Sequence, residues 1–304
     1  MRYTISFLLA SAALTTAALA EPPQVVTDIP PVQSLVAMVM EGVAVPSLLL
    51  PKGASEHAYQ LRPSQAAEIA GADLVVWIGP ELTPWLDGAL DTRPEDAASL
   101  ALLAAEGTAL RDYGDAGGHD HGDHDDEGHD HSGLDPHAWL DPANGRLWVG
   151  LIAAELARID PANAATYAVN AETAAQAIDA AEAQAAALLA PVRDLPFVAF
   201  HDAYGYYTGH FGLTLAGTVA LGDASTPGAQ RLAGLRDLVE HDGAVCLFPE
   251  VGHDPALIAQ LAEGTGVRIG GALDPAGTAL DPGPQAYGAL LTDMAQALAD
   301  CLGG

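Results

Sequence analysis

The sequence predicts an α/β protein of two lobes, each a mainly parallel β-sheet flanked by helices. Two observations support this fold class. In both halves of the chain, short continuous apolar runs alternate with segments of helical apolar spacing, which is the rhythm of parallel strands joined by crossover helices. Between the halves lies a long alanine-rich run without a break, which predicts a long rigid linker helix joining the lobes.

The first half contains two clear strand signals. The apolar run over 43–50 ends at Pro51, and the run over 72–78 ends at a Gly-Pro pair, so both predict buried strands. The remaining elements expected here are a short strand within 24–31, a helix over 32–40, a helix over 64–70 and a helix near Trp85.

Helices dominate the middle of the chain. Apolar spacing over 144–158 predicts one helix, and the run over 161–189 predicts another of roughly 40 Å. We interpret the longer one as a connector between lobes; a surface helix of a single domain is the alternative. The predicted organisation is a lobe over residues 21–160, a linker helix over 161–190 and a lobe over 191–304.

The second half repeats the rhythm of the first. A strand over 197–200 ends at His201, and the run over 267–273 predicts a strand that ends at Asp274. The other elements expected are a strand over 213–219, a helix over 227–240, a strand over 244–248, a helix over 255–265 and a last helix over 287–302. In such sheets, ligands bind beyond the carboxyl ends of the strands.

The N-terminal residues 1–20 carry one arginine, an apolar run and then Ala18-Leu19-Ala20. This pattern is typical of a cleavable secretory signal peptide, and it is too short for a good membrane span. We therefore expect an exported chain, with an uncleaved N-terminal anchor as the alternative.

The formal net charge is −29, and Lys52 is the only lysine. A field of this sign repels nucleic acid and anionic membranes and concentrates cations. We therefore expect no nucleic-acid partner. General solubility accounts for the charge equally well, so charge alone identifies no ligand.

The segment 117–133 is rich in histidine and acidic residues and has no large apolar side chain. It cannot bury a face, so it predicts a mobile loop. Imidazole and carboxylate groups both bind divalent metals, so we expect weak metal binding by the loop, with an acidic solubilising linker as the alternative. The histidines concerned are His119, His121, His124, His129 and His131.

Three other histidines lie in positions where a parallel sheet places ligands. His57 follows the predicted strand over 43–50, His137 lies in the DPHAWLDP turn, and His201 ends the strand over 197–200. Each alone could be a hydrogen-bonded polar residue. Because two come from the first half and one from the second, a shared metal ion would lie in the cleft between the lobes.

Cys246 and Cys301 are the only cysteines. In an exported chain they can pair, and the bond would pin the last helix to the strand that holds Cys246. No CxxC spacing favours them as metal ligands.

Five long segments carry a family resemblance. They are GASEHAYQLRPSQAAEIAGADLVVWIGPEL at 53–82, DPHAWLDP at 135–142, FVAFHDAYGYY at 197–207, TPGAQRL at 226–232 and VRIGGALDP at 267–275. With the histidine-rich loop, they resemble the zinc-binding proteins of bacterial ABC importers, the ZnuA type, over essentially all of the mature chain. The resemblance implies two lobes joined by a long helix, metal in the cleft, a periplasmic location and delivery of zinc to an ABC permease and its ATPase. We expect a monomer.

The resemblance also implies a ligand set. The three histidine ligands of the family fall on His57, His137 and His201. The fourth position falls on Glu56, with Asp274 or water as alternatives.

A structural disulfide is implied for the two cysteines, Cys246 and Cys301. We give no role to His253. The carboxylates expected to orient the histidine rings, chosen by proximity in sequence, are Asp135, Asp141 and Asp202, with capping of a turn as the alternative for each.

Three imidazoles with an oxygen ligand or water suit tetrahedral Zn²⁺, whereas the manganese-binding relatives have a carboxylate where His201 stands. The predicted function is high-affinity capture of periplasmic Zn²⁺ for uptake, and not an enzymatic activity. A periplasmic zinc buffer or chaperone and a manganese-binding paralogue are the alternatives. A zinc hydrolase is disfavoured, because the sequence has no HExxH motif.

Overall fold

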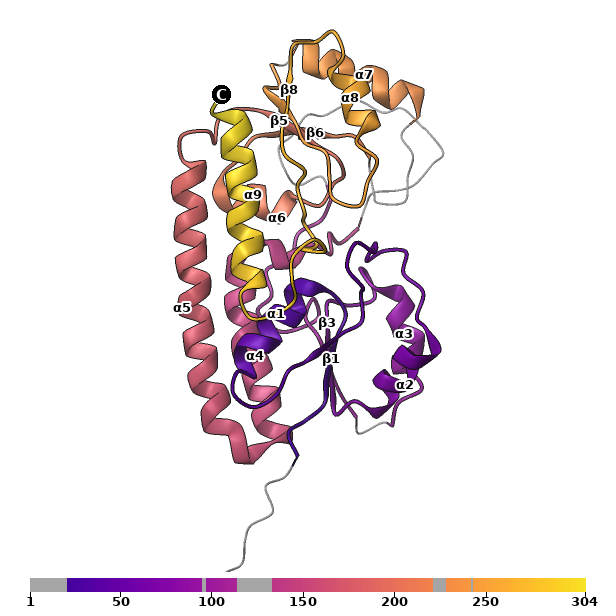
Figure 1. Cartoon of the computed structure of the whole chain (residues 1–304), viewed down its shortest axis with the longest axis vertical. Coiled ribbons are helices and arrows are strands. Elements are labelled where there is room, and N and C mark those ends of the chain that lie inside the picture. The colour runs from indigo at the N-terminus through magenta and orange to yellow at the C-terminus, as the bar shows by residue number, and fades with distance from the viewer. Residues whose placement is uncertain (1–20, 95–96, 114–132, 221–227, 242) are drawn as a thin grey trace, which may run out of the picture.

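The computed structural model describes residues 21–94, 97–113, 133–220, 228–241 and 243–304. These residues form two α/β lobes, stacked one above the other in Figure 1. Each lobe contains a four-stranded sheet in which every strand pair is parallel, so the predicted fold class is confirmed. The predicted signal peptide lies outside the described residues. No helix within them is both long and apolar enough to cross a membrane.

The first sheet has the strand order β2-β1-β3-β4. Alternate residues of its central strands enter two different apolar clusters, because helices cover both faces of the sheet. The elements of this lobe are β1 (Val25–Thr27), α1 (Pro30–Val39), β2 (Ser47–Leu48), α2 (Pro63–Gly71), β3 (Leu74–Trp77), α3 (Pro84–Leu90) and β4 (Ala98–Ala101).

Two elements of this lobe differ from the sequence prediction. The strand expected over 43–50 shrinks to Ser47–Leu48, and Val45 before it is 86% exposed. The apolar run had suggested burial, but part of it lies in the turn that follows α1. The edge strand β4 was not predicted, because Ala98–Ala101 carries only a weak apolar pattern.

The second sheet has the order β6-β5-β7-β8. Its edge strand β8 is exposed and much shorter than the buried strand expected over 267–273. Helix α6, which directly follows the His201 segment, was not predicted. The elements of this lobe are β5 (Phe197–Ala199), α6 (Gly205–Phe211), β6 (Leu215–Thr218), α7 (Ala229–His241), β7 (Cys246–Leu247), α8 (Ala256–Ala262) and β8 (Arg268–Ile269).

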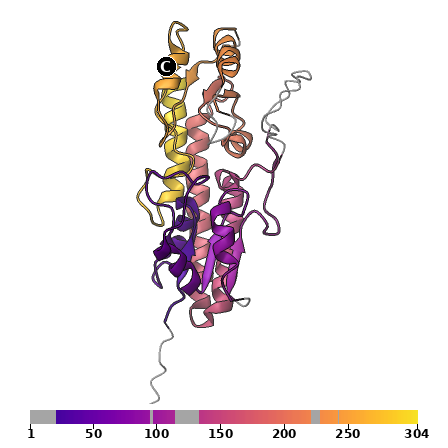
Figure 2. The ribbon, with the colours of Figure 1, turned by 90° about the vertical axis from the view of Figure 1, so that its right-hand side faces the viewer.

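Long helices run along one side of both lobes. Helix α5 has 26 residues, so it spans about 39 Å, and it packs against α1, α4 and α9. Figure 1 shows α5 beside both lobes, and Figure 2 shows the same arrangement from the side. The helices concerned are α4 (Pro142–Ile159), the short 3₁₀ helix η2 (Pro161–Asn163), α5 (Ala164–Leu189) and α9 (Ala286–Leu302).

The two lobes share one apolar core. Buried alanines on the inner face of α5 allow its neighbours to approach closely, and a single cluster of buried residues extends from Val25 to Leu302. The long helix therefore joins the lobes through packed contacts along its length. The division of the chain into domains at residues 160 and 190 stays a prediction.

Hydrogen bonds also cross between the lobes close to the helices. The Trp139 indole donates to the carbonyl of Pro275 at 2.7 Å, and the Tyr287 hydroxyl donates to the carbonyl of Trp139 at 2.7 Å. The backbone N–H of Tyr287 donates to the hydroxyl of Ser34 at 2.9 Å. These buried bonds fix the segment after His137 against the second lobe.

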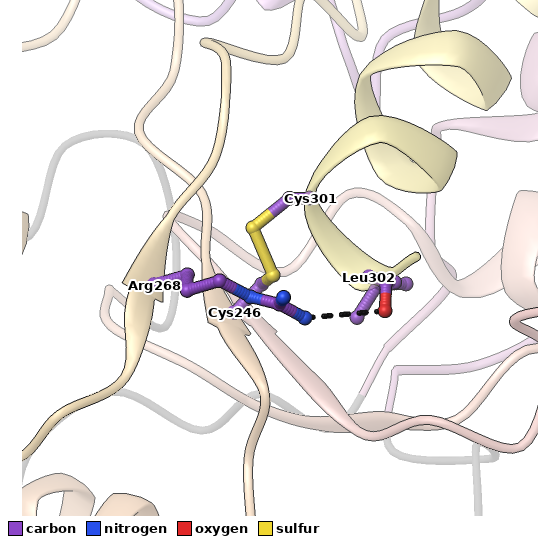
Figure 3. The surroundings of a disulfide bond; sticks show 4 residues. All are labelled: Cys246, Arg268, Cys301 and Leu302. Carbon is purple, nitrogen blue, oxygen red and sulfur yellow. Dashed lines mark hydrogen bonds between the residues drawn. A yellow bond between two sulfur atoms is a disulfide. The ribbon is translucent and has the colours of Figure 1, made fainter. Parts of the chain in front are cut away.

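A disulfide joins Cys246 on β7 to Cys301 near the end of α9 (Figure 3). Beside it, the Arg268 guanidinium donates to the carbonyl of Leu302 at 3.2 Å. Closing a loop of this length stabilises the fold by roughly 4 kcal/mol in the chain-entropy account. The predicted disulfide is confirmed, and it holds the last helix against the second sheet.

Candidate metal centre

Three loops bring the predicted histidines together between the lobes. His57 lies in the loop between β2 and α2, His137 lies directly before the short helix η1 (Ala138–Leu140), and His201 follows β5. One ring nitrogen of each lies within 4.8 Å of the others. Of the described residues, only these three form such a group of potential ligands.

The rings surround a common point instead of stacking. The ring centroid of His137 lies 5.4 Å from the centroid of His57 and 5.4 Å from that of His201. The centroids of His57 and His201 are 6.4 Å apart. The ring planes are inclined by 50° to 83°. This is the arrangement that three imidazoles need to direct one nitrogen each at a single ion.

His137 is held by a carboxylate on the side away from the group. Its ring is buried, and its Nδ1 lies 2.8 Å from Asp135 Oδ1, which also accepts the backbone N–H of His137 at 3.0 Å. With the proton on Nδ1, the other nitrogen carries a lone pair. That Nε2 is buried and has no hydrogen-bond partner among the described residues, which fits a role as a metal ligand.

Arg111 balances the charge of Asp135. Its Nε lies 3.9 Å from Asp135 Oδ2, and its guanidinium donates to the carbonyl of Gly205 and lies over the Tyr206 ring. A Cβ at Gly205 would lie 2.8 Å from the guanidinium carbon, so the close approach requires glycine. Burial raises the pKa of Asp135 to about 7, although the bond from His137 and the charge of Arg111 oppose the rise.

His201 has a different carboxylate partner. Its buried Nδ1 lies 2.7 Å from Glu250 Oε2, and the Tyr204 hydroxyl donates to the same oxygen at 2.8 Å. Sequence proximity missed Glu250, because it lies 49 residues from His201. The rule that found His201 could have found it, since Glu250 follows β7 and β7 pairs with β5.

Of the carboxylates expected to orient the rings, only Asp135 has a described bond to one of them. Asp141 was expected to do so, and this is wrong. Its carboxylate caps α4 by accepting the N–H of Ala143 at 2.8 Å, and it pairs with His210 at 2.9 Å. Asp202 acts through its charge, which contributes to raising the pKa of His201.

The two carboxylates considered for a fourth ligand lie in different settings. Glu56 is buried, with Oε1 4.0 Å from His57 Nε2, and burial raises its pKa to about 7. Asp274 accepts the N–H groups of Thr278 and Ala279 at 2.9 Å and 2.8 Å, so its oxygens already organise a turn.

The three rings differ in basicity. Burial, together with the neighbouring imidazoles, lowers the pKa of His57 and of His137 well below 6.5. Burial would also lower the pKa of His201, but the charge and hydrogen bond of Glu250 outweigh it and raise that pKa. His57 and His137 are therefore neutral at physiological pH, as ligands must be.

A small cleft of about 60 Å³ opens beside the histidines. Its walls are the loop over 53–56 from the first lobe and the loops over 250–253 and 274–278 from the second. Residues of both lobes therefore line this cleft, and two of them, Glu56 and Glu250, lie beside histidines of the metal centre.

The predicted histidine-rich loop, with His119, His121, His124, His129 and His131, lies outside the described residues. Its flanks are described. The N–H of Tyr113 donates to the carbonyl of Gly133 at 3.0 Å, and the N–H of Asp135 donates to the carbonyl of Arg111 at 3.0 Å. The two flanks of the loop therefore meet beside the carboxylate that holds His137.

A model of the family "Zinc-uptake complex component A periplasmic" matches residues 25–301. The chain is 51% identical to the high-affinity zinc uptake system protein ZnuA of Paracoccus denitrificans over 98% of both chains. It is 38% identical to the protein of that name from Brucella abortus over 91% of both. A crystal structure of a ZnuA has a TM-score of 0.75 and 21% identity, and it covers 92% of this chain and 99% of its own.

Proposed function

The chain belongs to the ZnuA family of periplasmic zinc-uptake components, and we propose that His57, His137 and His201 are the ligands with which it captures Zn²⁺. Its function is to bind zinc in the periplasm for import through an ABC transporter. The observation that supports the ligand set is the meeting of three ring nitrogens within 4.8 Å, from three loops and two lobes.

The geometry favours a single tight ion. Ligand atoms on tetrahedral zinc lie about 3.3 Å apart when each bond is about 2.0 Å long, so the nitrogens need only a small further approach. The carboxylates on Nδ1 of His137 and His201 leave Nε2 of each ring for the metal and hold the ring orientation.

We propose Glu56 as the fourth ligand. Its carboxylate lies beside His57 in a buried position, and binding an ion would balance its charge. Asp274 and water remain the alternatives, and the bonds from Thr278 and Ala279 favour a structural role for Asp274.

The donor set favours zinc over manganese. Imidazole nitrogen suits Zn²⁺, whereas Mn²⁺ prefers sites rich in carboxylate and water oxygens. Three nitrogens with at most one carboxylate therefore make a zinc site. Copper also binds imidazole strongly, so selectivity against it depends on availability and geometry.

Calorimetry with a competing chelator tests the ligand set. In the full chain, His57→Ala and His201→Ala should each weaken the tight zinc site by about 10³-fold, because each removes one of a few strong metal bonds. His210→Gln is the matched control, since His210 pairs with Asp141 and Glu182 away from the centre. Unchanged tight binding in both alanine variants would refute the assignment.

We further propose that residues 1–20 direct export and that the chain, as a monomer, hands zinc to a permease and its ATPase. A zinc buffer would bind the metal equally well without such a partner. Growth in chelated medium separates the two roles. A strain lacking the protein should grow poorly there and recover with added zinc, whereas growth equal to that of the parent strain would favour a buffer.

A further inference from the structure

Glu250 and His253 form a second pair of potential ligands in the cleft. They lie three residues apart in the turn after β7, with the N–H of His253 bonded to the carbonyl of Glu250 at 3.2 Å. His253 Nε2 lies 3.5 Å from Glu250 Oε1. The other oxygen of the same carboxylate is the one that holds His201. Glu250 therefore holds the Nδ1 side of the His201 ring with one oxygen and faces His253 with the other.

The separation of these two atoms fits a shared ion better than a hydrogen bond. A charge-assisted N–H···O bond is typically about 2.8 Å long. Two ligand atoms on tetrahedral zinc are about 3.3 Å apart, from bonds of about 2.0 Å. The observed 3.5 Å is close to the second value.

The His253 ring is held in place while part of it stays accessible. It packs on the Phe200 ring at 4.3 Å between centroids, and 25% of its side chain is exposed. Its centroid lies 6.4 Å from that of His201, the same separation as between His57 and His201. An ion bound by His253 would therefore lie next to the three-histidine centre but outside it.

The charge around the cleft also favours a cation. Glu56, Glu250 and Asp274 all line it, and none of the described lining residues is an arginine or a lysine. Packed carboxylates without a compensating charge repel one another, and a divalent ion relieves that repulsion.

We propose that His253 Nε2 and Glu250 Oε1 form an outer divalent-cation site in this cleft, completed by water, which receives zinc before it enters the three-histidine centre. The proposal rests on the zinc-binding function proposed above. Binding here is weaker than at the inner site, because the protein supplies two ligands instead of three or four. Since Glu250 contacts both His201 and His253, an ion at the outer site would lie next to the ring of an inner ligand.

Two measurements on the full chain test the outer site, with Zn²⁺ itself as the probe. In imidazole ¹⁵N spectra, a first equivalent of zinc should shift the signals of the inner histidines, and excess zinc should then shift the His253 signal. In stopped-flow loading, His253→Phe should slow zinc uptake severalfold and change the inner affinity less than twofold. Phenylalanine keeps the ring on Phe200 but cannot bind metal.

Asp254→Asn is the control, because it removes a neighbouring charge while asparagine can still cap the N–H of Ala256. Zinc taken up by residues 119–131 is common to all variants. A His253 signal that excess zinc leaves unmoved, or equal loading rates in the wild type and His253→Phe, would overturn the outer site. A wild-type chain without any tight zinc would instead overturn the proposed function.

Discussion

The two buried histidines of the metal centre make a natural comparison, since His137 belongs to the first lobe and His201 to the second. Both rings are 1% exposed, and both place Nδ1 against a carboxylate, at 2.8 Å and 2.7 Å. Yet the pKa of His137 is lowered and that of His201 is raised. Equal burial and similar hydrogen bonds therefore accompany pKa shifts in opposite directions.

The charges beside each ring account for the difference. The charge of His201 lowers the pKa of His137 further, whereas the charge and hydrogen bond of Glu250 outweigh burial at His201. Asp135 lies beside the Arg111 guanidinium, and burial raises its own pKa to about 7. Its carboxylate is therefore partly protonated near neutral pH, and its negative charge has less effect on His137. Glu250 has no arginine or lysine among its described ion pairs, so no such cation offsets the effect of its charge on the pKa of His201. The comparison teaches that, at equal burial, the charges beside each ring set the difference in basicity between the two ligands.

Among the changes that test this comparison, neutralising each orienting carboxylate gives the largest expected effect. Glu250→Gln should weaken zinc binding toward the upper end of the 10–100-fold range typical of such partners, and Asp135→Asn toward the lower end. The reason is that Asp135 already shares its charge with Arg111. Chelator-competition calorimetry measures both. Equal losses, or a larger loss for Asp135→Asn, would break the comparison.

The pH dependence of affinity is the next largest effect. A ligand must be neutral, and the raised pKa makes His201 the first of the three rings to gain a proton as pH falls. The His201 proton alone should lower the affinity about tenfold per pH unit below that pKa, and protonation of Glu56, whose pKa burial raises to about 7, adds to the fall. His57 and His137 stay neutral through this window because their pKa values are lowered.

Chelator competition between pH 5 and 8 follows this dependence. In Glu250→Gln the fall should begin at lower pH, because the charge that raises the pKa of His201 is gone. A fall that begins at the same pH in the wild type and in Glu250→Gln would contradict the comparison.

Removing the cation beside Asp135 should have the smallest effect. Without the guanidinium, as in Arg111→Met, the pKa of Asp135 rises further, and the protonated group orients His137 less well. We expect about a fivefold loss of zinc affinity, below the range for removing the carboxylate itself. Arg158→Met is the control, since Arg158 pairs with Glu155 on the exposed surface of α4. Unchanged zinc affinity in Arg111→Met would show that Arg111 does not influence the metal centre.

Much of the fold could be read from local patterns. The strands around Val75 and Val198 and the long helix over Ala164–Leu189 follow from apolar runs and helical spacing, which depend on neighbouring residues alone. The ends of the strands were harder to predict. Strands β2 and β8 are shorter than their apolar runs, because pairing with a neighbouring strand, and not hydrophobicity, decides where a strand ends.

The residues of the metal centre also fall into those that the sequence predicted and those that it did not. The meeting of His57, His137 and His201 could be predicted, because His57 and His201 follow strands of parallel sheets, where ligands bind, and all three lie in segments that resemble the ZnuA family. Glu250 was missed, because sequence proximity pointed to Asp141 and Asp202, although its place after β7 could have indicated it. The cleft beside His253 could not be predicted.

The sequence by itself therefore determined the class of fold, the three histidines and the cysteine pair, all of which depend on residue type and local order. Only the tertiary structure decided which charge lies against which ring. The pairing of β5 with β7 brings Glu250 to His201, and the packing of α6 brings Gly205 and Tyr206 to Arg111. Such contacts join distant parts of the chain, and electrostatic effects at a few ångströms depend on them alone.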